Sequence, residues 1–245
     1  MNFKKWFTKN NNDKNGLDIK SGNQIKAGSI TRQKMAEIIK KREKISEEEL
    51  DKGYDLMKKY PRSVTILGSA RFDENNIYYK RAYSLAYKIV KELNYTVVTG
   101  GGPGIMEAAS KGAYEAGGTS VGFIIKLPKE QSINKYLTEY VEFEYFFTRK
   151  TLLSFGAETC IYFPGGFGTM DELFEMATLI QTEKISRTPI ILVGKEFWTP
   201  FLDLLKQKLA VEEATIDMAD TEIYKIVDEE DEIIDIIRNA PYKEA

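Results

Sequence analysis

The sequence predicts an α/β protein, with a Rossmann-like doubly wound parallel sheet and an N-terminal helical extension. From residue 61 onward, short apolar runs alternate with segments in which apolar residues recur at helical spacing. This alternation is typical of parallel strands joined by crossover helices. Several apolar runs end in glycine-rich segments. Because ligands of such sheets bind beyond the carboxyl ends of the strands, these segments should share one edge of the sheet.

The apolar runs and the helical segments alternate along most of the chain. Strands are predicted at residues 64–67, 95–99, 120–125, 141–147, 160–163, 189–193 and 223–227. Helices are predicted at residues 78–93, 106–116, 149–156, 170–182, 197–210 and 229–239.

The first 60 residues differ in composition from the rest of the chain. Residues 1–30 are rich in Lys, Asn and Gly, so we predict that they are disordered, with a short helix around Phe3, Trp6 and Phe7 as the alternative. Residues 31–60 have helical periodicity and form the predicted extension. Ser46 and Glu49 match a capping box, which predicts two helices with a break near Ser46. Residues 61–245 form the predicted Rossmann-like domain.

The composition narrows the class of function. Lys and Arg total 35 and Asp and Glu total 37, and this near-neutral balance argues against nucleic acid as the main partner. The chain has no histidine, which removes the usual general base and the usual zinc ligand, so no metal is expected. The lone Cys160 lies in an apolar run and is predicted to be a buried hydrophobe of a cytoplasmic protein. Neither a signal peptide nor a membrane-spanning segment is predicted.

Residues 164–172, PGGFGTMDE, follow an apolar run and open a predicted helix. Free N–H groups at a helix start favour an anion, and small residues allow its close approach, here Gly165, Gly166 and Gly168. Thr169 could donate its hydroxyl to a phosphate oxygen, or it could be an ordinary N-cap. Glu172 is placed either for catalysis or as the capping-box partner of Thr169. The spacing alone leaves both interpretations open.

Residues 100–107, GGGPGIME, form a second strand-to-helix loop. The spacing differs from the dinucleotide fingerprint GxGxxG, and no Gly-Lys-Ser/Thr of a Walker loop follows. The candidate contacts to a flat group or a sugar are Gly101, Gly102 and Gly104. Glu107 could meet a ribose hydroxyl or cap its helix.

Two further segments carry candidate site residues. Gly68 and Ser69 end the first predicted strand, and the Ser69 hydroxyl could donate a hydrogen bond to a ligand. Arg149 and Lys150 begin a predicted helix, where a cation opposes the helix dipole. Such a local conflict indicates a functional role, and a solvated basic pair is the alternative.

The two segments 100–109 and 164–172, with Arg149-Lys150 between them, closely resemble the LOG family of cytokinin riboside 5'-monophosphate phosphoribohydrolases. The similarity extends from about residue 63 to about residue 210, and Gly68-Ser69 matches the first loop of the family. The resemblance implies a Rossmann-like fold, usually dimeric, that hydrolyses a nucleoside 5'-monophosphate to free base and ribose 5-phosphate.

The resemblance also implies roles for individual residues. Arg149 and Glu172 match the two positions regarded as catalytic, and the phosphate-binding turn is matched by Gly165, Gly166, Gly168 and Thr169. A nearby carboxylate would stabilise the oxocarbenium-like state of glycosidic cleavage. The expected partners are a nucleoside monophosphate and further copies of the chain, without a cofactor. An apolar helix face could serve either the dimer or the core: Leu173, Phe174, Met176, Ala177 and Ile180.

Other functions stay open at this point. Many family members have Met-His-Glu where this chain has Phe146-Phe147-Thr148, so a broader purine or pyrimidine nucleotide nucleosidase fits this sequence at least as well as an enzyme for cytokinin ribotides. A carrier or sensor of the same fold would bind a phosphorylated ligand without turnover. The helices at 31–59 could instead recruit a partner protein. A lysine decarboxylase is disfavoured, because pyridoxal phosphate needs a lysine and the loops offer only Lys111 and Lys150.

Overall fold

The computed structural model describes residues 31–127 and 133–241. The chain divides into two compact units, residues 1–42 and residues 43–245. The predictions of disorder for residues 1–30 and of a helix around Phe3, Trp6 and Phe7 lie outside the described residues.

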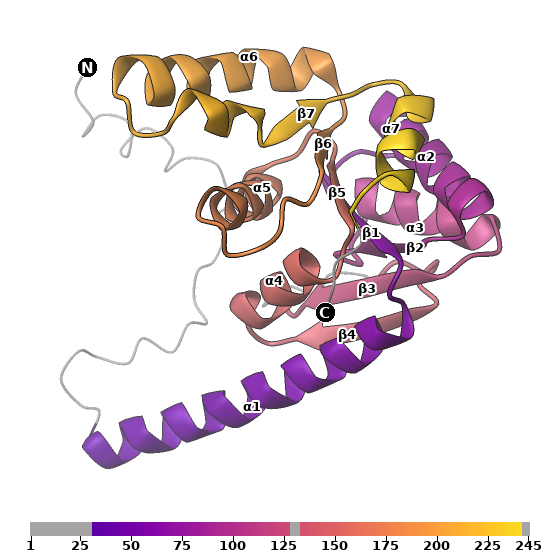
Figure 1. Ribbon diagram of the computed structural model, residues 1–245. Coiled ribbons are helices and arrows are strands. Elements are labelled where there is room, and N and C mark those ends of the chain that lie inside the picture. The colour runs from indigo at the N-terminus through magenta and orange to yellow at the C-terminus, as the bar shows by residue number, and fades with distance from the viewer. Residues whose placement is uncertain (1–30, 128–132, 242–245) are drawn as a thin grey trace, which may run out of the picture. The chain divides into compact units, whose positions relative to one another are not determined.

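The larger unit contains a parallel seven-stranded sheet with the order β4-β3-β2-β1-β5-β6-β7 (Figure 1). The strands are β1 (Ser63–Leu67), β2 (Thr96–Thr99), β3 (Ser120–Ile125), β4 (Glu139–Phe143), β5 (Thr159–Tyr162), β6 (Ile190–Leu192) and β7 (Tyr224–Ile226). The chain winds outward from β1 to β4, returns to the centre at β5 and winds outward again to β7. The predicted doubly wound Rossmann-like fold is therefore confirmed, and its topological switch point lies between β1 and β5.

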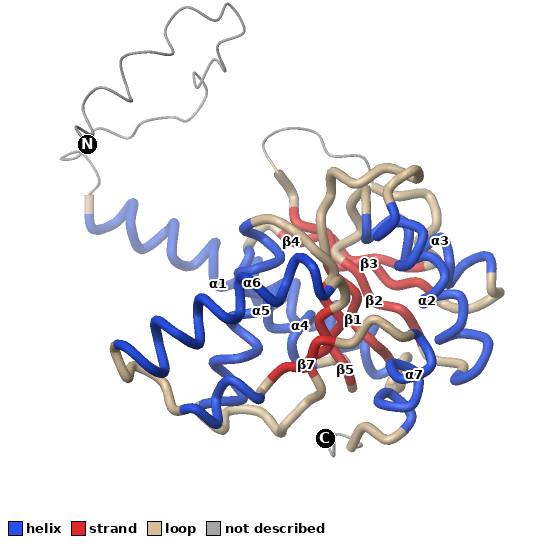
Figure 2. Tube along the Cα trace, turned by 90° about the horizontal axis from the view of Figure 1, so that it is seen from above, coloured by secondary structure: helices blue, strands red, loops and turns tan. Residues whose placement is uncertain are grey.

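Helices cover both faces of the sheet (Figure 2). One face packs against α2 (Ile77–Leu93), α3 (Ile105–Glu115) and α7 (Glu230–Arg238). The other packs against the C-terminal part of α1 (Arg32–Lys59) and against α4 (Phe146–Phe155), α5 (Phe167–Gln181) and α6 (Lys195–Leu205). A π-helical turn (Lys206–Glu212) and a 3₁₀ helix (Met218–Glu222) follow α6.

Period-two alternation assigns the strand residues to the two cores. Val64 and Ile66 of β1 pack with α2 and α3, whereas Leu67 packs with α5 and α6. All five residues of β1 are buried, as expected for a central strand covered on both faces. The central strands are thus held from both sides, and the loops at their carboxyl ends begin from fixed positions.

Three predicted element boundaries were wrong, and each change affects the candidate site. The predicted strand 141–147 ends at Phe143, and α4 begins at Phe146, so Arg149 lies at the end of the first helical turn. Helix α5 begins at Phe167 rather than at residue 170, because the glycine loop itself enters the helix. The N-cap is Gly166, so Thr169 is not the N-cap and the capping-box interpretation of Thr169 and Glu172 is wrong.

The predicted break near Ser46 was also wrong, because residues 32–59 form one helix. Glu49 therefore does not cap a helix that begins at Ser46. Its buried carboxylate accepts hydrogen bonds from the backbone N–H of Glu144 and from the Thr148 hydroxyl. The spacing of Ser46 and Glu49 does match a capping box, but the Glu49 side chain makes its hydrogen bonds to residues distant in the sequence.

Gly104 fixes the distance between the loop after β1 and the start of α3. Its φ is 72° and its ψ is −132°, a conformation that only glycine adopts without strain. A Cβ at this position would lie 2.2 Å from the Ser69 carbonyl oxygen. The same carbonyl accepts the hydrogen bond of the Ile105 N–H at 3.0 Å.

We expect Gly104→Ala to lower the free energy of unfolding by more than about 2 kcal/mol, through backbone strain and the clash with Ser69. Gly117→Ala is the matched control, because Gly117 also has a positive φ of 80° but has nothing within 4 Å of its added Cβ. The control should cost about 1 kcal/mol. Urea unfolding of both variants measures the difference, and equal losses would contradict the proposed contact.

Candidate active site

A cleft of about 830 Å³ opens at the topological switch point, beyond the carboxyl ends of β1 and β5. Its walls come from the loop after β1, from the first turns of α3, α4 and α5, and from α6. It brings together eight of the predicted site residues: Gly68, Ser69, Arg149, Gly165, Gly166, Gly168, Thr169 and Glu172. Five others do not line it: Gly101, Gly102, Gly104, Glu107 and Lys150.

The turn from β5 into α5 presents backbone N–H groups to this cleft. An α-helix leaves the N–H groups of its first turn without intrahelical acceptors, and in α5 the first intrahelical bond is from the Met170 N–H to the Gly166 carbonyl. A Cβ on Gly166 or Gly168 would meet nothing within 4 Å, so open space lies beside this turn. Gly165 differs, since its Cβ would lie 2.1 Å from the Thr169 hydroxyl oxygen. The turn therefore combines a tight bend with room for a ligand.

The loop after β1 is joined directly to this turn. The Ser69 N–H donates to the Pro164 carbonyl at 3.0 Å, and the Ser69 hydroxyl oxygen accepts from the Arg71 N–H at 3.1 Å. Gly68 is required because a Cβ there would lie 2.8 Å from the Ile105 side chain. The two loops on either side of the switch point thus form one wall.

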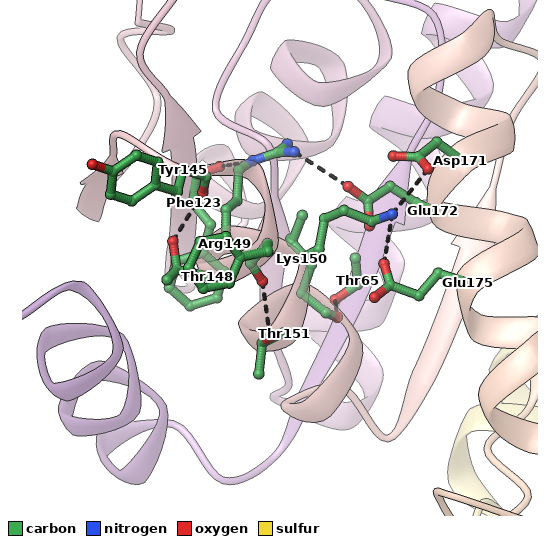
Figure 3. A network of polar contacts seen from close by, with 12 residues as sticks. Thr65, Phe123, Tyr145, Thr148, Arg149, Lys150, Thr151, Asp171, Glu172 and Glu175 are labelled. Carbon is green, nitrogen blue, oxygen red and sulfur yellow. Dashed lines mark hydrogen bonds and ion pairs between the residues drawn. The ribbon is translucent and has the colours of Figure 1, made fainter. Parts of the chain in front are cut away.

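Arg149 and Glu172 both line the cleft, and they form a buried ion pair (Figure 3). Arg149 Nη1 lies 3.3 Å from Glu172 Oε1, and the two side chains are 10% and 7% exposed. Arg149 Nε donates to the carbonyl of Phe123, within β3, at 2.7 Å. A Cβ on Gly100 would lie 2.5 Å from Arg149 Nη2, so the guanidinium passes directly over the glycine that follows β2. The pair therefore spans four segments of the fold.

Burial controls the ionisation of this pair. Desolvation raises the pKa of Glu172 from 4.5 to about 7, although Arg149 and Lys150 lower it. Desolvation lowers the pKa of Arg149 from its ordinary value, and the charge of Glu172 opposes this change. An arginine remains charged in proteins, so Glu172 is the member of the pair that exchanges a proton near neutral pH.

Lys150 faces α5 rather than the cleft. Its ammonium group lies 2.9 Å from Asp171 and 2.7 Å from Glu175 (Figure 3). Burial alone would lower its pKa, but the hydrogen bonds to Glu175 and Asp171 raise it overall. A lysine that forms a Schiff base needs a lowered pKa, so these contacts suit a structural bridge between α4 and α5.

The loop 100–104 packs against segments next to the cleft, and Gly101, Gly102 and Gly104 do not line it. Its Gly101 carbonyl accepts from the Asn134 N–H at 3.1 Å, and Asn134 is buried. Burial raises the pKa of the Tyr79 hydroxyl to about 12, and the charge of Glu107 is the second largest cause. Glu107 lies 3.5 Å from this hydroxyl. The glycines of this loop allow close packing against different neighbours: Gly100 lies beside Arg149, Gly101 beside Ile124 and Gly104 beside Ser69.

Sequence reasoning missed the apolar side of the cleft. Its walls include Phe72, Met106, Phe146, Phe197 and Phe201. They come from separate elements, so no local spacing marked them. Phe146 and Phe167 of this lining are 55% and 97% exposed, so they add apolar surface that solvent can reach.

Residues 31–127 and 133–241 contain no group of three or more His, Cys, Asp or Glu side chains arranged to hold a metal ion. Among these residues, no helix is both long and apolar enough to cross a membrane. Of the apolar face predicted for α5, Leu173, Met176 and Ile180 belong to the core, whereas Phe174 is 42% exposed.

A family model described as "possible lysine decarboxylase" matches residues 106–237, more than half of the chain. The chain belongs to this family. It is the LOG family that the sequence motifs resemble, so the resemblance is confirmed. The match includes Arg149, Lys150 and the glycine turn before α5, while β1 and α1 lie outside it.

A curated relative of the LOG family is the cytokinin riboside 5'-monophosphate phosphoribohydrolase of Rhodococcoides fascians. It is 27% identical over 150 residues, which cover 60% of this chain and 75% of the relative. Among solved structures, a structural genomics target matches with a TM-score of 0.54 at 26% identity. The match covers 72% of this chain and 98% of the target's chain. The molybdenum cofactor carrier protein of Chlamydomonas reinhardtii has the same fold, with a TM-score of 0.54, 19% identity and coverage of 73% and 97%.

The raised pKa of Glu172 predicts a pH-dependent stability. Its carboxyl binds a proton more tightly in the folded state (pKa about 7) than in the unfolded chain (about 4.5). The stabilisation from this group is therefore complete below pH ~4.5, falls as the pH rises toward ~7 and is lost above that. We expect Glu172→Gln to match the wild type near pH 4.5 and to be more stable at pH 8, by at most about 3 kcal/mol.

Urea unfolding of the wild type and Glu172→Gln at several pH values measures this difference. A difference that stays constant across the pH range would show that the pKa of Glu172 is the same in the folded and unfolded states and would contradict the raised pKa.

Proposed function

We propose that this member of the LOG family hydrolyses the N-glycosidic bond of a nucleoside 5'-monophosphate, a cytokinin ribotide or an AMP-like nucleotide, to free base and ribose 5-phosphate. The observation that carries the proposal is the buried Arg149–Glu172 pair beside a helix start that exposes backbone N–H groups. The relatives named as phosphoribohydrolases support it at the level of the family.

The phosphate would bind at the start of α5. Backbone N–H groups of the first turn and the helix dipole both favour an anion there. Open space beside Gly166 and Gly168 allows the close approach of a phosphate group, and the Thr169 hydroxyl adds a donor. A phosphate held at this turn places the attached ribose next to Glu172, one turn further along the same helix.

Glu172 would act on the sugar and on water. A carboxylate near C1′ stabilises the positive charge that develops as the glycosidic bond breaks. With a pKa of about 7 it can also accept a proton from the attacking water at neutral pH. The water oxygen bonds to C1′, the C1′–N bond breaks, and in the net reaction one water proton ends on the released base.

Arg149 would hold Glu172 in place and direct an N–H group toward the departing base or the phosphate. The aromatic wall around Phe146 and Phe197 would cover the faces of the base. An apolar wall of this kind accepts a planar base without selecting one purine or pyrimidine.

A carrier of a phosphorylated ligand is the second candidate. The observation in its favour is that Glu172 is only 7% exposed and already paired, so the cleft could bind an anion without bringing this carboxylate to the ligand. The carrier has no need for a carboxylate with a raised pKa, which favours the hydrolase.

The proposal predicts base release from at least one of AMP, GMP, CMP, UMP and a cytokinin ribotide, measured by chromatography. Glu172→Gln should abolish turnover, while nucleotide affinity stays within about tenfold, or ~1.4 kcal/mol, because the phosphate contacts remain.

Glu183→Gln is the matched control, an exposed glutamate just beyond the far end of α5, and it should keep full activity. Measurable nucleotide binding without base release from any of the five nucleotides would support the carrier. Full activity of Glu172→Gln would contradict the catalytic role of the residue.

We also propose that the protein acts as a homodimer in the cytoplasm, where its nucleotide substrates occur. The family resemblance implies the dimer, and exposed phenylalanines on α4 and α5 offer an apolar surface: Phe155 and Phe174. Sedimentation equilibrium at micromolar concentration should give twice the chain mass of 28.0 kDa. A mass of 28.0 kDa across the range would contradict the proposal.

A further inference from the structure

Helix α4, which carries Arg149, begins without a cap of its own. Its N-cap residue is Tyr145, whose side chain makes no capping hydrogen bond. A carboxylate from a different helix lies at this position instead. Glu49 of α1 accepts hydrogen bonds from the Glu144 N–H and from the Thr148 hydroxyl, whose oxygen is 2.6 Å from Glu49 Oε2. The negative charge suits the N-terminal end of a helix dipole.

Three contacts at four-residue spacing keep α1 and α4 in register. Glu49 meets Thr148, a Cβ on Gly53 would lie 2.0 Å from Leu152, and a Cβ on Gly156 would lie 1.2 Å from Met57. The numbers rise together along both helices, so the helices run parallel at this contact. Small residues at two of the three positions allow close packing, which makes Glu49 the polar member of a tight interface.

The position of α4 determines where the Arg149 guanidinium lies. Thr148 directly precedes Arg149, so a hydrogen bond to its hydroxyl limits rotation of the first turn of α4. The guanidinium has little freedom to compensate, since it is held by the Phe123 carbonyl, passes over Gly100 and meets Glu172 at 3.3 Å. A small rotation of α4 would lengthen the contact between Arg149 and Glu172.

We propose that Glu49 is a positioning residue for Arg149, which makes the helix preceding β1 a working part of the active site. Glu49 touches neither the cleft nor the ion pair, and it acts through Thr148. It lies outside residues 106–237, the part of the chain that the family model matches. The expected effect of Glu49 on catalysis rests on the proposed function. The expected effect of Glu49 on the Arg149–Glu172 ion pair does not.

The ionisation of Glu172 reports the geometry of the pair independently of turnover. Five charged or titratable groups face Glu172 from the surrounding elements: Arg149 and Lys150 of α4, Asp171 and Glu175 of α5, and Tyr162 of β5. Arg149 is the largest of the influences that lower the pKa of Glu172. Displacing its guanidinium should therefore raise this pKa, whereas a uniform loss of stability should leave it unchanged.

The experiment compares the wild type with Glu49→Ala, Thr148→Val and Glu49→Gln. The pKa of Glu172 is measured by NMR titration of glutamate labelled at the carboxyl carbon, with Glu172→Gln to assign the signal. We expect Glu49→Ala and Thr148→Val to raise the pKa by about one unit, because an opposite charge at this distance shifts a carboxyl by one to three units. Glu49→Gln should restore the wild-type value, since a carboxamide can accept from the Glu144 N–H and donate to Thr148.

Base release by the same variants tests the catalytic consequence. Glu49→Ala and Thr148→Val should lower kcat by about tenfold to a hundredfold with KM within about threefold, because the phosphate contacts lie on α5. Glu48→Ala is the matched control, since Glu48 is the adjacent glutamate of the same helix with a side chain 54% exposed. It should leave both the pKa and kcat unchanged.

The outcomes separate the two proposals. If no nucleotide is hydrolysed but the pKa of Glu172 moves as expected, the proposed function fails and the positioning role stands. If the wild type is active and the pKa and kcat of Thr148→Val and Glu49→Ala equal those of the wild type, the positioning role is overturned. A folded Thr148→Val variant keeps the test decisive even if Glu49→Ala does not fold.

Discussion

The buried ion pair between Arg149 and Glu172 is the interaction on which the rest of the site depends. Removing two charges from water is costly, and their attraction compensates only when further polar partners hold the geometry. This chain supplies such partners from separate segments: the Phe123 carbonyl within β3 for Arg149, and the ammonium group of Lys150 near Glu172. The glycine after β2 leaves room for the guanidinium. The glycine-rich loops are therefore needed as much for placing this pair as for approaching a ligand.

The topology explains why these segments meet. The switch point between β1 and β5 opens a crevice at the centre of the sheet, and α4 and α5 begin next to it. The hydrogen bond from Ser69 to Pro164 joins the loops on the two sides. Because the central strands are buried on both faces, these loops start from rigid positions, which a reaction sensitive to ångström-scale placement requires.

Much of this arrangement could be predicted from the sequence, since periodicity gave the strand and helix order, and the turn around Gly165 indicated an anion site. The sequence could not reveal the start of α5 at Phe167, because glycines carry no helical signal of their own. The role of Glu49 was also predicted wrongly, because its spacing from Ser46 matches a local helix cap. Its hydrogen-bond partners lie 95 and 99 residues away in the sequence. The aromatic wall around Phe146 and Phe197 gathers from separate elements, so it became visible only with the fold.

In the proposed reaction, the charges around Glu172 would connect phosphate binding with proton transfer. Two cations, Arg149 and Lys150, face three carboxyl groups there, Asp171, Glu172 and Glu175. Because the pKa of Glu172 is about 7, its carboxyl is protonated in part of the molecules at neutral pH. The net charge of these five side chains is therefore zero when Glu172 is protonated and −1 when it is ionised. A phosphate at the start of α5 adds negative charge nearby and favours the protonated form. Release of the base leaves positive charge on the ribose, which favours the carboxylate. In the proposed reaction the protonated carboxyl group gives its proton to the departing base as the glycosidic bond breaks. The carboxylate that results stabilises the charge on the ribose and then accepts a proton from the attacking water, so a histidine is not required for either step.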